Sequence, residues 1–200
     1  MKKNNFLILS QGYNLILSVL VLSVISDLFI SNTLSCIGYT LVLILAFIYR
    51  NPSRNNFTNE KNNFYSPIDG KIVAIDKSKN KQRIFINVNM CNTHLVTAPK
   101  NSTMTIHKIK NGLNLSSNTY KARKLNNQIT LKFDNIKVKF ISGFCNSNIN
   151  FKNQITLKLG DEIGIFLEGL VIIELPLNTN INVSLNDKIY SNKTLLTKLD

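Results

Sequence analysis

The chain has 200 residues, a formal net charge of +13 and a mean hydropathy of +0.03. This length favours one domain with an appendage, and it allows a hydrophobic core that needs no disulfide or metal for stability. The three cysteines form no CxxC pair, so the sequence predicts neither a disulfide framework nor a metal site, and the bulk of the chain is expected in a reducing compartment.

The first 50 residues differ in composition from the rest. They hold three of the 24 basic side chains and one of the 11 acidic ones, and they contain two apolar runs, at residues 6–30 and 34–49. Each run is close to the ~20 residues that span a bilayer core, and a polar Ser-Asn-Thr stretch separates them. Residues 1–50 are therefore predicted to be a membrane anchor that forms a transmembrane helical hairpin. The alternatives are a single span behind an interfacial stretch, or a cleaved signal peptide.

Basic residues flank the predicted anchor on both sides. Lys2 and Lys3 precede the first run, Arg50 and Arg54 follow the second, and the turn between the runs has no Lys or Arg. Positive flanks stay in the cytoplasm, so we expect both ends of the anchor, and the bulk of the chain, on the cytoplasmic side.

The remainder of the chain is also basic, which has three interpretations. The excess attracts anionic phospholipid head groups, binds nucleic acid, or reflects a general abundance of Lys and Asn. No basic strand rich in aromatic residues and no basic helical stripe supports nucleic acid. We therefore expect membrane phospholipids with anionic head groups as partners, and no nucleic acid, while a homo- or hetero-oligomer stays open.

Strand signals dominate after a polar, Asn-rich linker at residues 51–63. Apolar residues alternate with polar ones at 129–133, 136–140, 155–159 and 181–185, and shorter apolar stretches lie at 71–75 and 84–90. Residues 170–175 are continuously apolar except for one Glu, which predicts a central strand. Residues 64–200 are thus expected to form a mostly β domain, an antiparallel sandwich or barrel.

Two residues of this domain are candidates for chemistry. Asp69 lies in a Ser-Pro-Ile-Asp-Gly turn at residues 66–70, where it either shapes the turn or acts in a site. His94 follows an apolar run and enters a loop that ends at Pro99, where catalytic groups are often presented, although a lone histidine is more often structural. His107 has lysine neighbours and is read as a surface residue. A Cys91–His94 pair is disfavoured, because a spacing of three on a strand places the side chains on opposite faces.

Taken together, the motifs resemble those of the phosphatidylserine decarboxylase family, in its short, membrane-anchored form. The resemblance covers nearly the whole chain in order. It comprises Tyr-Arg-Asn-Pro-Ser-Arg at 49–54, Ser-Pro-Ile-Asp-Gly at 66–70, His94 with Ala98-Pro99, Asn-Asn-Gln at 126–128, Ile-Ser-Gly at 141–143, Gly169, and the stretches 185–189 and 194–196.

The resemblance implies a function in phospholipid biosynthesis. Members of the family decarboxylate phosphatidylserine to phosphatidylethanolamine, using a pyruvoyl group made from a serine of their own chain after a Gly-Ser bond breaks. The carbonyl of that group supplies the electron sink, and the protein orients it. By the same resemblance, Asp69 and His94 take the inherited positions that assist serine attack and proton transfer.

The sequence departs from this pattern at its most important position. Gly169 takes the place of the glycine, but Leu170 takes the place of the pyruvoyl-forming serine, and residues 160–177 contain no Ser, Thr or Cys. Other positions differ too: Thr97 replaces an Arg of the family pattern, Asn92 replaces an Asp, and Asn127-Gln128 replace Glu-Arg. We expect no pyruvoyl group and no other cofactor, and we expect Leu170 to fill the core, where burial contributes about 1.5–3 kcal/mol.

Three functions are compatible with these observations. The first is a family member that has lost self-processing and enzymatic activity but still binds lipid or a partner. The second is an active decarboxylase that uses an unrecognised route or a competent partner subunit. The third is a membrane-tethered module that binds lipid or protein. The departure at Leu170 favours the first.

Overall fold

The computed structural model of the chain describes residues 8–51, 62–116, 119–144, 151 and 155–199. The chain divides into two compact units, an N-terminal helical unit over residues 2–53 and a strand-rich unit over residues 54–200. Most of the linker predicted at 51–63 lies outside the described residues.

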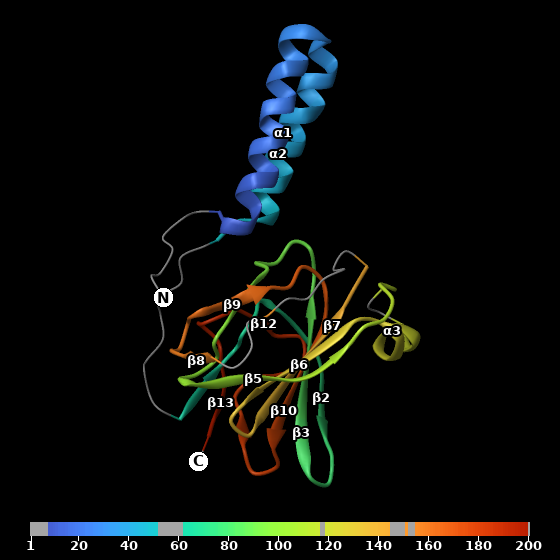
Figure 1. Cartoon of the computed structure of the whole chain (residues 1–200). Coiled ribbons are helices and arrows are strands. Elements are labelled where there is room, and N and C mark those ends of the chain that lie inside the picture. Colours follow the sequence, from blue (N-terminus) through green and yellow to red (C-terminus); the bar gives the residue numbers. More distant parts are fainter. Residues whose placement is uncertain (1–7, 52–61, 117–118, 145–150, 152–154, 200) are drawn as a thin grey trace. The chain divides into compact units, whose positions relative to one another are not determined.

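The helical unit is a pair of apolar helices, α1 (Ser10–Phe29) and α2 (Asn32–Ile48), joined by a short turn (Figure 1). The Ser31 hydroxyl accepts a hydrogen bond from the Leu34 backbone N–H at 3.4 Å, and this N-cap starts α2. Within α1, the 18 residues Gly12–Phe29 have a mean hydropathy of 1.8, which is the length and composition of a membrane-spanning helix; α2 is apolar but shorter.

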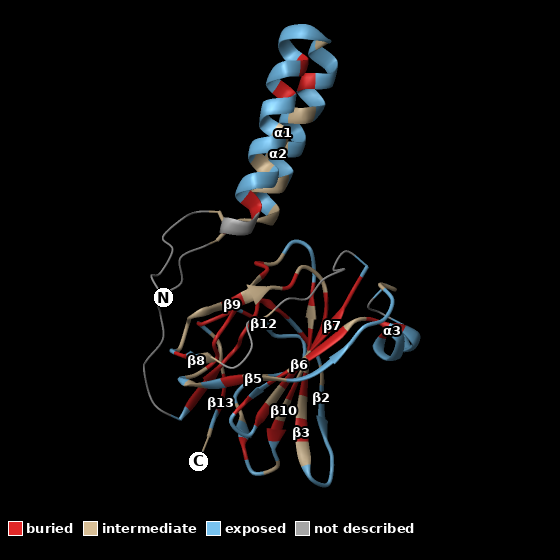
Figure 2. Ribbon diagram, viewed as in Figure 1, coloured by how far each residue is buried: buried red, intermediate tan, exposed pale blue. Residues whose placement is uncertain are grey.

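Small and polar residues hold the two helices together. Ser23, Ser26 and Ser35 are buried between them, and a Cβ on Gly38 would overlap the Ser23 hydroxyl, so the backbones approach closely. The Ser35 hydroxyl also donates to the Asp27 carboxylate at 2.9 Å. The large apolar side chains point outward instead, and most of the unit is exposed (Figure 2). This inverted arrangement suits an apolar surrounding rather than water.

The strand-rich unit contains three antiparallel sheets within the described residues, which confirms the predicted fold class. The largest has eight strands, in the order β12 (Lys188–Ile189), β2 (Gly70–Lys77), β3 (Lys81–Val88), β10 (Gly169–Pro176), β7 (Ile136–Ser142), β6 (Gln128–Phe133), β5 (Ser102–Lys110) and β8 (Ile155–Leu157). The second consists of β1 (Asn63–Tyr65), β13 (Leu195–Lys198) and β11 (Asn180–Ile181), and the third of β4 (Leu95–Thr97) and β9 (Glu162–Ile165).

One hydrophobic core lies on the inner face of the large sheet. Strand β3 alternates strictly between half-buried and buried residues, and its Ile84 and Ile86 are fully buried. The two small sheets contribute Phe64, Val96 and Leu196 to the same core cluster, so they cover this face in the manner of a sandwich. Strands β3, β10, β7 and β6 are neighbours in this order, and buried residues recur along β10 and β7 in Figure 2.

Several elements differ from the sequence prediction. The strand expected at 181–185 is wrong: only Asn180–Ile181 is a strand, because the Asp187 carboxylate accepts from the Ser184 N–H at 2.7 Å and turns the chain. The strand expected at 155–159 ends at Leu157, before a turn that contains Gly160 at φ +84°. Strand β5 and the short helix α3 (Tyr120–Leu125) were not predicted, and in β5 a register shift at His107 breaks the alternation.

Candidate functional site

The motif residues converge at one end of the large sheet. A single row of paired residues crosses five strands there, namely Lys71, Asn87, Leu170, Ile141 and Gln128. The row lies within one residue of the start of β2, β10 and β6 and within one residue of the end of β3 and β7. Antiparallel pairing therefore brings together three segments that are far apart in the sequence: the turn before β2, the glycine that opens β10, and the asparagines before β6.

Asp69 is anchored at this end of the sheet, two residues before Lys71. It is 4% exposed, and its Oδ1 accepts a hydrogen bond from the Ser191 backbone N–H at 2.8 Å. The next residue has to be glycine, because a Cβ on Gly70 would lie 2.7 Å from the Asn87 carbonyl oxygen. Two strand spacings, roughly 10 Å, separate the β2 and β10 backbones. Asp69 and Gly169 thus lie at the same end of the sheet, on strands with only β3 between them.

His94 lies between these segments along a chain of backbone contacts. Its side chain is 1% exposed, and its carbonyl oxygen accepts from the Phe166 N–H at 2.8 Å, three residues before Gly169. Three residues after His94, the Thr97 N–H donates to the Pro67 carbonyl at 2.9 Å, within the turn that carries Asp69. The segment 94–97 therefore bridges the Asp69 turn and the stretch that leads to Gly169.

Gly169 opens β10 in a conformation that only glycine tolerates. Its φ is +143°, and a Cβ there would overlap the Ile141 carbonyl oxygen and lie 2.9 Å from the Gly143 N. The Gly143 N–H also donates to the Glu168 carbonyl at 2.9 Å. The Gly motif at 141–143 and the glycine at 169 are thus packed backbone against backbone.

Leu170 is buried, at 4% exposure, but it does not fill the main core as expected. In β10 the core residues are Val171, Ile173 and Leu175, and successive side chains alternate between the two faces of a sheet. Leu170 therefore points to the opposite face, together with its strand partner Ile141, which is also buried and also outside the core cluster.

Asn126 fixes the loop beside this site. Its Nδ2 donates to the carbonyls of Leu115 at 2.7 Å and of Ser142 at 2.6 Å, while its Oδ1 accepts from the Leu115 N–H at 2.9 Å. The Ser142 N–H in turn donates to the Asn127 carbonyl at 2.9 Å. Asn126 is fully buried, and its three side-chain bonds hold the 112–116 loop and the end of β7 in place.

The groups around Asp69 are mostly neutral. The Thr97 hydroxyl lies 2.6 Å from the Ser191 hydroxyl and donates to the Asn192 side chain at 2.9 Å, and all three residues are buried. Glu162, paired in register with Thr97, is a nearby acid; burial raises the pKa of its carboxyl above the ordinary value. Asn92, the other departure nearby, is half-buried.

No sequence pattern indicated Ser191 and Asn192, which complete this network from more than 90 residues away. Asn192 has φ +57°, a turn conformation that asparagine tolerates.

The remaining histidine, His107, is exposed, and its Nε2 lies 3.4 Å from the Lys137 Nζ. Cys36 and Cys91 are exposed, whereas Cys145 lies outside the described residues. Within the described part of the chain, no three His, Cys, Asp or Glu side chains group as metal ligands.

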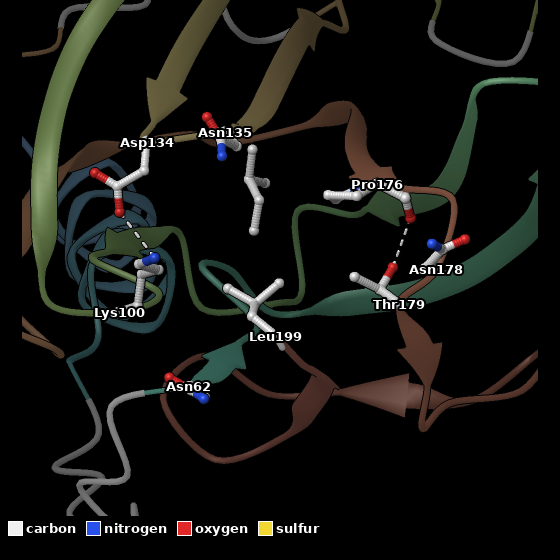
Figure 3. A pocket seen from close by; sticks show the side chains of 9 residues that line it. Asn62, Lys100, Asp134, Asn135, Pro176, Asn178, Thr179 and Leu199 are labelled. Atoms are coloured by element: carbon white, nitrogen blue, oxygen red, sulfur yellow. Dashed lines mark hydrogen bonds and ion pairs between the residues drawn. The ribbon is translucent and has the colours of Figure 1, made fainter.

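A pocket of about 270 Å³ lies at the other end of the large sheet (Figure 3). Its lining includes Pro176, the last residue of β10, and the ion pair between Lys100 and Asp134 at 2.8 Å. Strand β10 has eight residues, so roughly 23 Å separates this pocket from Gly169. The pocket is therefore distinct from the place where the motifs converge.

Comparison with known proteins identifies the class of protein that carries this arrangement. The sequence model of the phosphatidylserine decarboxylase family matches residues 43–197. The chain is 31% identical over 192 residues to a phosphatidylserine decarboxylase proenzyme from Amoebophilus asiaticus (strain 5a2), which covers 88% of this chain and 82% of the relative. No solved structure matches the chain. The chain belongs to the phosphatidylserine decarboxylase family.

Proposed function

We propose that this chain is a membrane-held member of the phosphatidylserine decarboxylase family that does not process itself and has no pyruvoyl-dependent activity. The observation that carries the proposal is the buried Leu170 directly after Gly169, in a stretch, residues 160–177, without Ser, Thr or Cys. The proposal also takes from the family resemblance that the residue after Gly169 is the one that must become the pyruvoyl group.

The chemistry of processing explains why leucine is not a conservative change. Cleavage starts when a β-hydroxyl or thiol attacks the preceding carbonyl carbon, here that of Gly169, and moves the acyl group from nitrogen to oxygen. Elimination then requires that oxygen or sulfur to leave from the β-carbon. Leucine has only hydrocarbon beyond its Cα, so it offers neither the nucleophile nor the leaving group. The residues of this chain therefore do not fit a pyruvoyl group.

The surroundings support the same conclusion. Where the family pattern has charged residues, this chain has Thr97, Asn92 and the pair Asn127-Gln128. Thr97 is engaged with neutral Ser191 and Asn192 rather than with an ion partner. These amide and hydroxyl side chains do not titrate near neutral pH, so they do not replace the charged groups of the family pattern as acids or bases.

The segments that carry Asp69 and His94 are nevertheless buried and tied together by hydrogen bonds. Both side chains are buried, and the Asp69 turn, the 94–97 segment and the Gly169 segment are hydrogen-bonded to one another. This joined arrangement, in a chain that also carries an apolar helical unit, supports a role in binding serine phospholipid or a protein partner in phospholipid metabolism. The cations before α1 and after α2 support an orientation with the strand-rich unit on the cytoplasmic side.

Intact mass and decarboxylation, measured on the same preparation, test the proposal. The purified full chain is expected as one species of 22.6 kDa and should release no carbon dioxide from phosphatidylserine vesicles, with the Amoebophilus asiaticus relative assayed in parallel as the positive control. Two fragments, the smaller with a blocked N-terminus at or near Leu170, would refute loss of processing. Turnover by the uncleaved chain alone would establish a different catalytic route, and turnover only after adding a second protein would establish a competent partner subunit.

A Leu170→Ser variant extends the test to the surroundings of the site. It restores the hydroxyl in a backbone that already has the left-handed glycine before it. We expect this variant to remain uncleaved or to cleave incompletely, because the neutral Thr97 network stays in place. Complete cleavage would mean that Leu170 alone blocks processing.

A further inference from the structure

The outer face of the large sheet carries a concentrated positive charge on β5, β6 and β7. In the strand register, Lys132 lies opposite Lys137, and Thr130 lies opposite both Lys108 and Lys139. Residues opposite one another point to the same side of a sheet, so these side chains share the face turned away from the core. The three strands contain no Asp or Glu. We call this surface the cationic face; its members are Lys108, Lys110, Lys132, Lys137 and Lys139.

The charges on this face crowd one another. Burial lowers the pKa of the Lys139 ammonium, and the charges of Lys110, Lys108 and Arg83 lower it further, with only Glu174 opposing them. That acid is already engaged, because Lys81 bonds it at 2.8 Å and Arg83 at 3.3 Å. Like charges side by side on a sheet disfavour folding, so this cluster is not explained by stability.

We propose that the cationic face docks onto the surface of an anionic lipid bilayer. The five lysines lie on the same face of three neighbouring strands, and each lysine near an anionic leaflet adds to the attraction. The chain also carries α1, with the length and composition of a spanning helix, and only ten residues, 52–61, separate the parts of the two units that the structure describes. A chain of that length reaches at most about 36 Å, so a bilayer that holds α1 is within range of the strand-rich unit.

The residue types on the face favour lipid over nucleic acid. The aromatic residues of β5, β6 and β7 are Phe133 and Phe140, which are both buried in the core and offer no platform on which bases could stack. All five cations are lysines, which act as mobile point charges rather than as the bidentate forks that read phosphate geometry. The inference rests on the membrane location in the proposed function and not on the loss of processing.

Lysine footprinting of the full chain tests the docking. The chain is reconstituted in vesicles of phosphatidylcholine alone or with 30% phosphatidylglycerol, labelled briefly with an acetylating reagent, and read by mass spectrometry. In the anionic vesicles we expect the five lysines of the cationic face to react at least threefold more slowly, and 0.5 M NaCl should remove this protection. Lys193 and Lys198 are the internal controls, because both are exposed, they lie in the turn before β13 and on β13 of the three-stranded sheet, outside the large sheet, and they should react equally in both vesicles.

A matched pair of charge reversals makes the test specific. Lys108→Glu with Lys132→Glu changes two exposed members of the face and should abolish the protection of the other members. Lys193→Glu with Lys198→Glu makes the same change in net charge outside the large sheet and should leave that protection intact. Equal reactivity of the face in both vesicle types, or equal loss in both double variants, would overturn the proposal.

The same preparation also distinguishes nucleic-acid binding by the face and the absence of a membrane anchor from lipid docking. If a duplex oligonucleotide removes the protection at a phosphate concentration below that of the lipid, the face is a nucleic-acid surface and the proposal is wrong. Carbonate extraction reports the anchor independently of docking. A chain that is extracted refutes the membrane location, whereas a chain that stays in the membrane with fully reactive lysines refutes only the docking.

Discussion

Replacing Leu170 with alanine measures how strongly this side chain has become part of the structure. Leu170 is 4% exposed, and the change removes three carbon atoms that are worth about 0.8 kcal/mol each, or roughly 2.4 kcal/mol. The cavity left behind adds to this, and buried Leu→Ala changes cost about 2–5 kcal/mol in total. We expect a loss of about 3 kcal/mol, which corresponds to about 10 °C in Tm for a domain of this size.

The assay is urea unfolding of the full chain in detergent micelles, followed by circular dichroism at the strand band while the helical hairpin remains folded in the micelle. Ile172→Ala is the matched control, because Ile172 lies on the same strand and face but is only half-buried, so its loss should be about half as large. A loss below about 1 kcal/mol for Leu170→Ala, with an unchanged m-value, would show that Leu170 does not pack and would refute this reasoning.

Three further changes probe the scaffold of the site. Gly169→Ala should destabilise the fold by about 2–4 kcal/mol, because the new Cβ overlaps the Ile141 carbonyl at a positive φ; a stable variant in the same unfolding assay would contradict the backbone geometry described here. Asn126→Ala removes the bonds to the buried Ser142 carbonyl and to the N–H and carbonyl of half-buried Leu115, and it should cost at least ~2 kcal/mol; a thermal melt unchanged from the parent chain would argue against this role. The raised pKa of Glu162 means that the folded state binds its proton more tightly than the unfolded state, so the contribution of this residue to stability should be lost as the pH rises from about 4.5 through the folded pKa. Glu162→Gln should flatten that part of the pH profile of unfolding, and an identical profile in both proteins would show that the carboxyl is not desolvated.

The regular parts of the large sheet were predictable because their cause is local. Alternating residues at 129–133 and 136–140 became β6 and β7, and the continuous apolar run after Gly169 became β10, which lies between β3 and β7. Each of these strands buries one or both of its faces, and the spacing of apolar residues in its own sequence indicates which. The segment 181–185 alternates equally well, but the Asp187 carboxylate offers a competing local hydrogen bond, and the turn prevails.

The site was less predictable because it depends on pairs that are distant in the chain. The bond from the Ser191 N–H to Asp69 spans 122 residues, and no local pattern indicates it. The orientation of Leu170 was hidden for another reason. In a continuous apolar run every residue looks like a core residue, so the pattern does not reveal which positions face the core, and register with Ile141 had to supply that information.

The placement of the motif residues also affects how their retention should be interpreted. Gly169 is held by its positive φ and by the Ile141 carbonyl, Asn126 by three bonds to buried backbone groups, and Asp69 by the bond that ties its turn to Ser191. The fold requires each of these residues whether or not the chain performs chemistry. Leu170 differs, because its backbone remains in the ladder with any side chain and its side chain lies outside the main core. A family member that loses processing can therefore change this one position while it keeps the motifs around it, so the retained motifs identify the family but do not argue for activity.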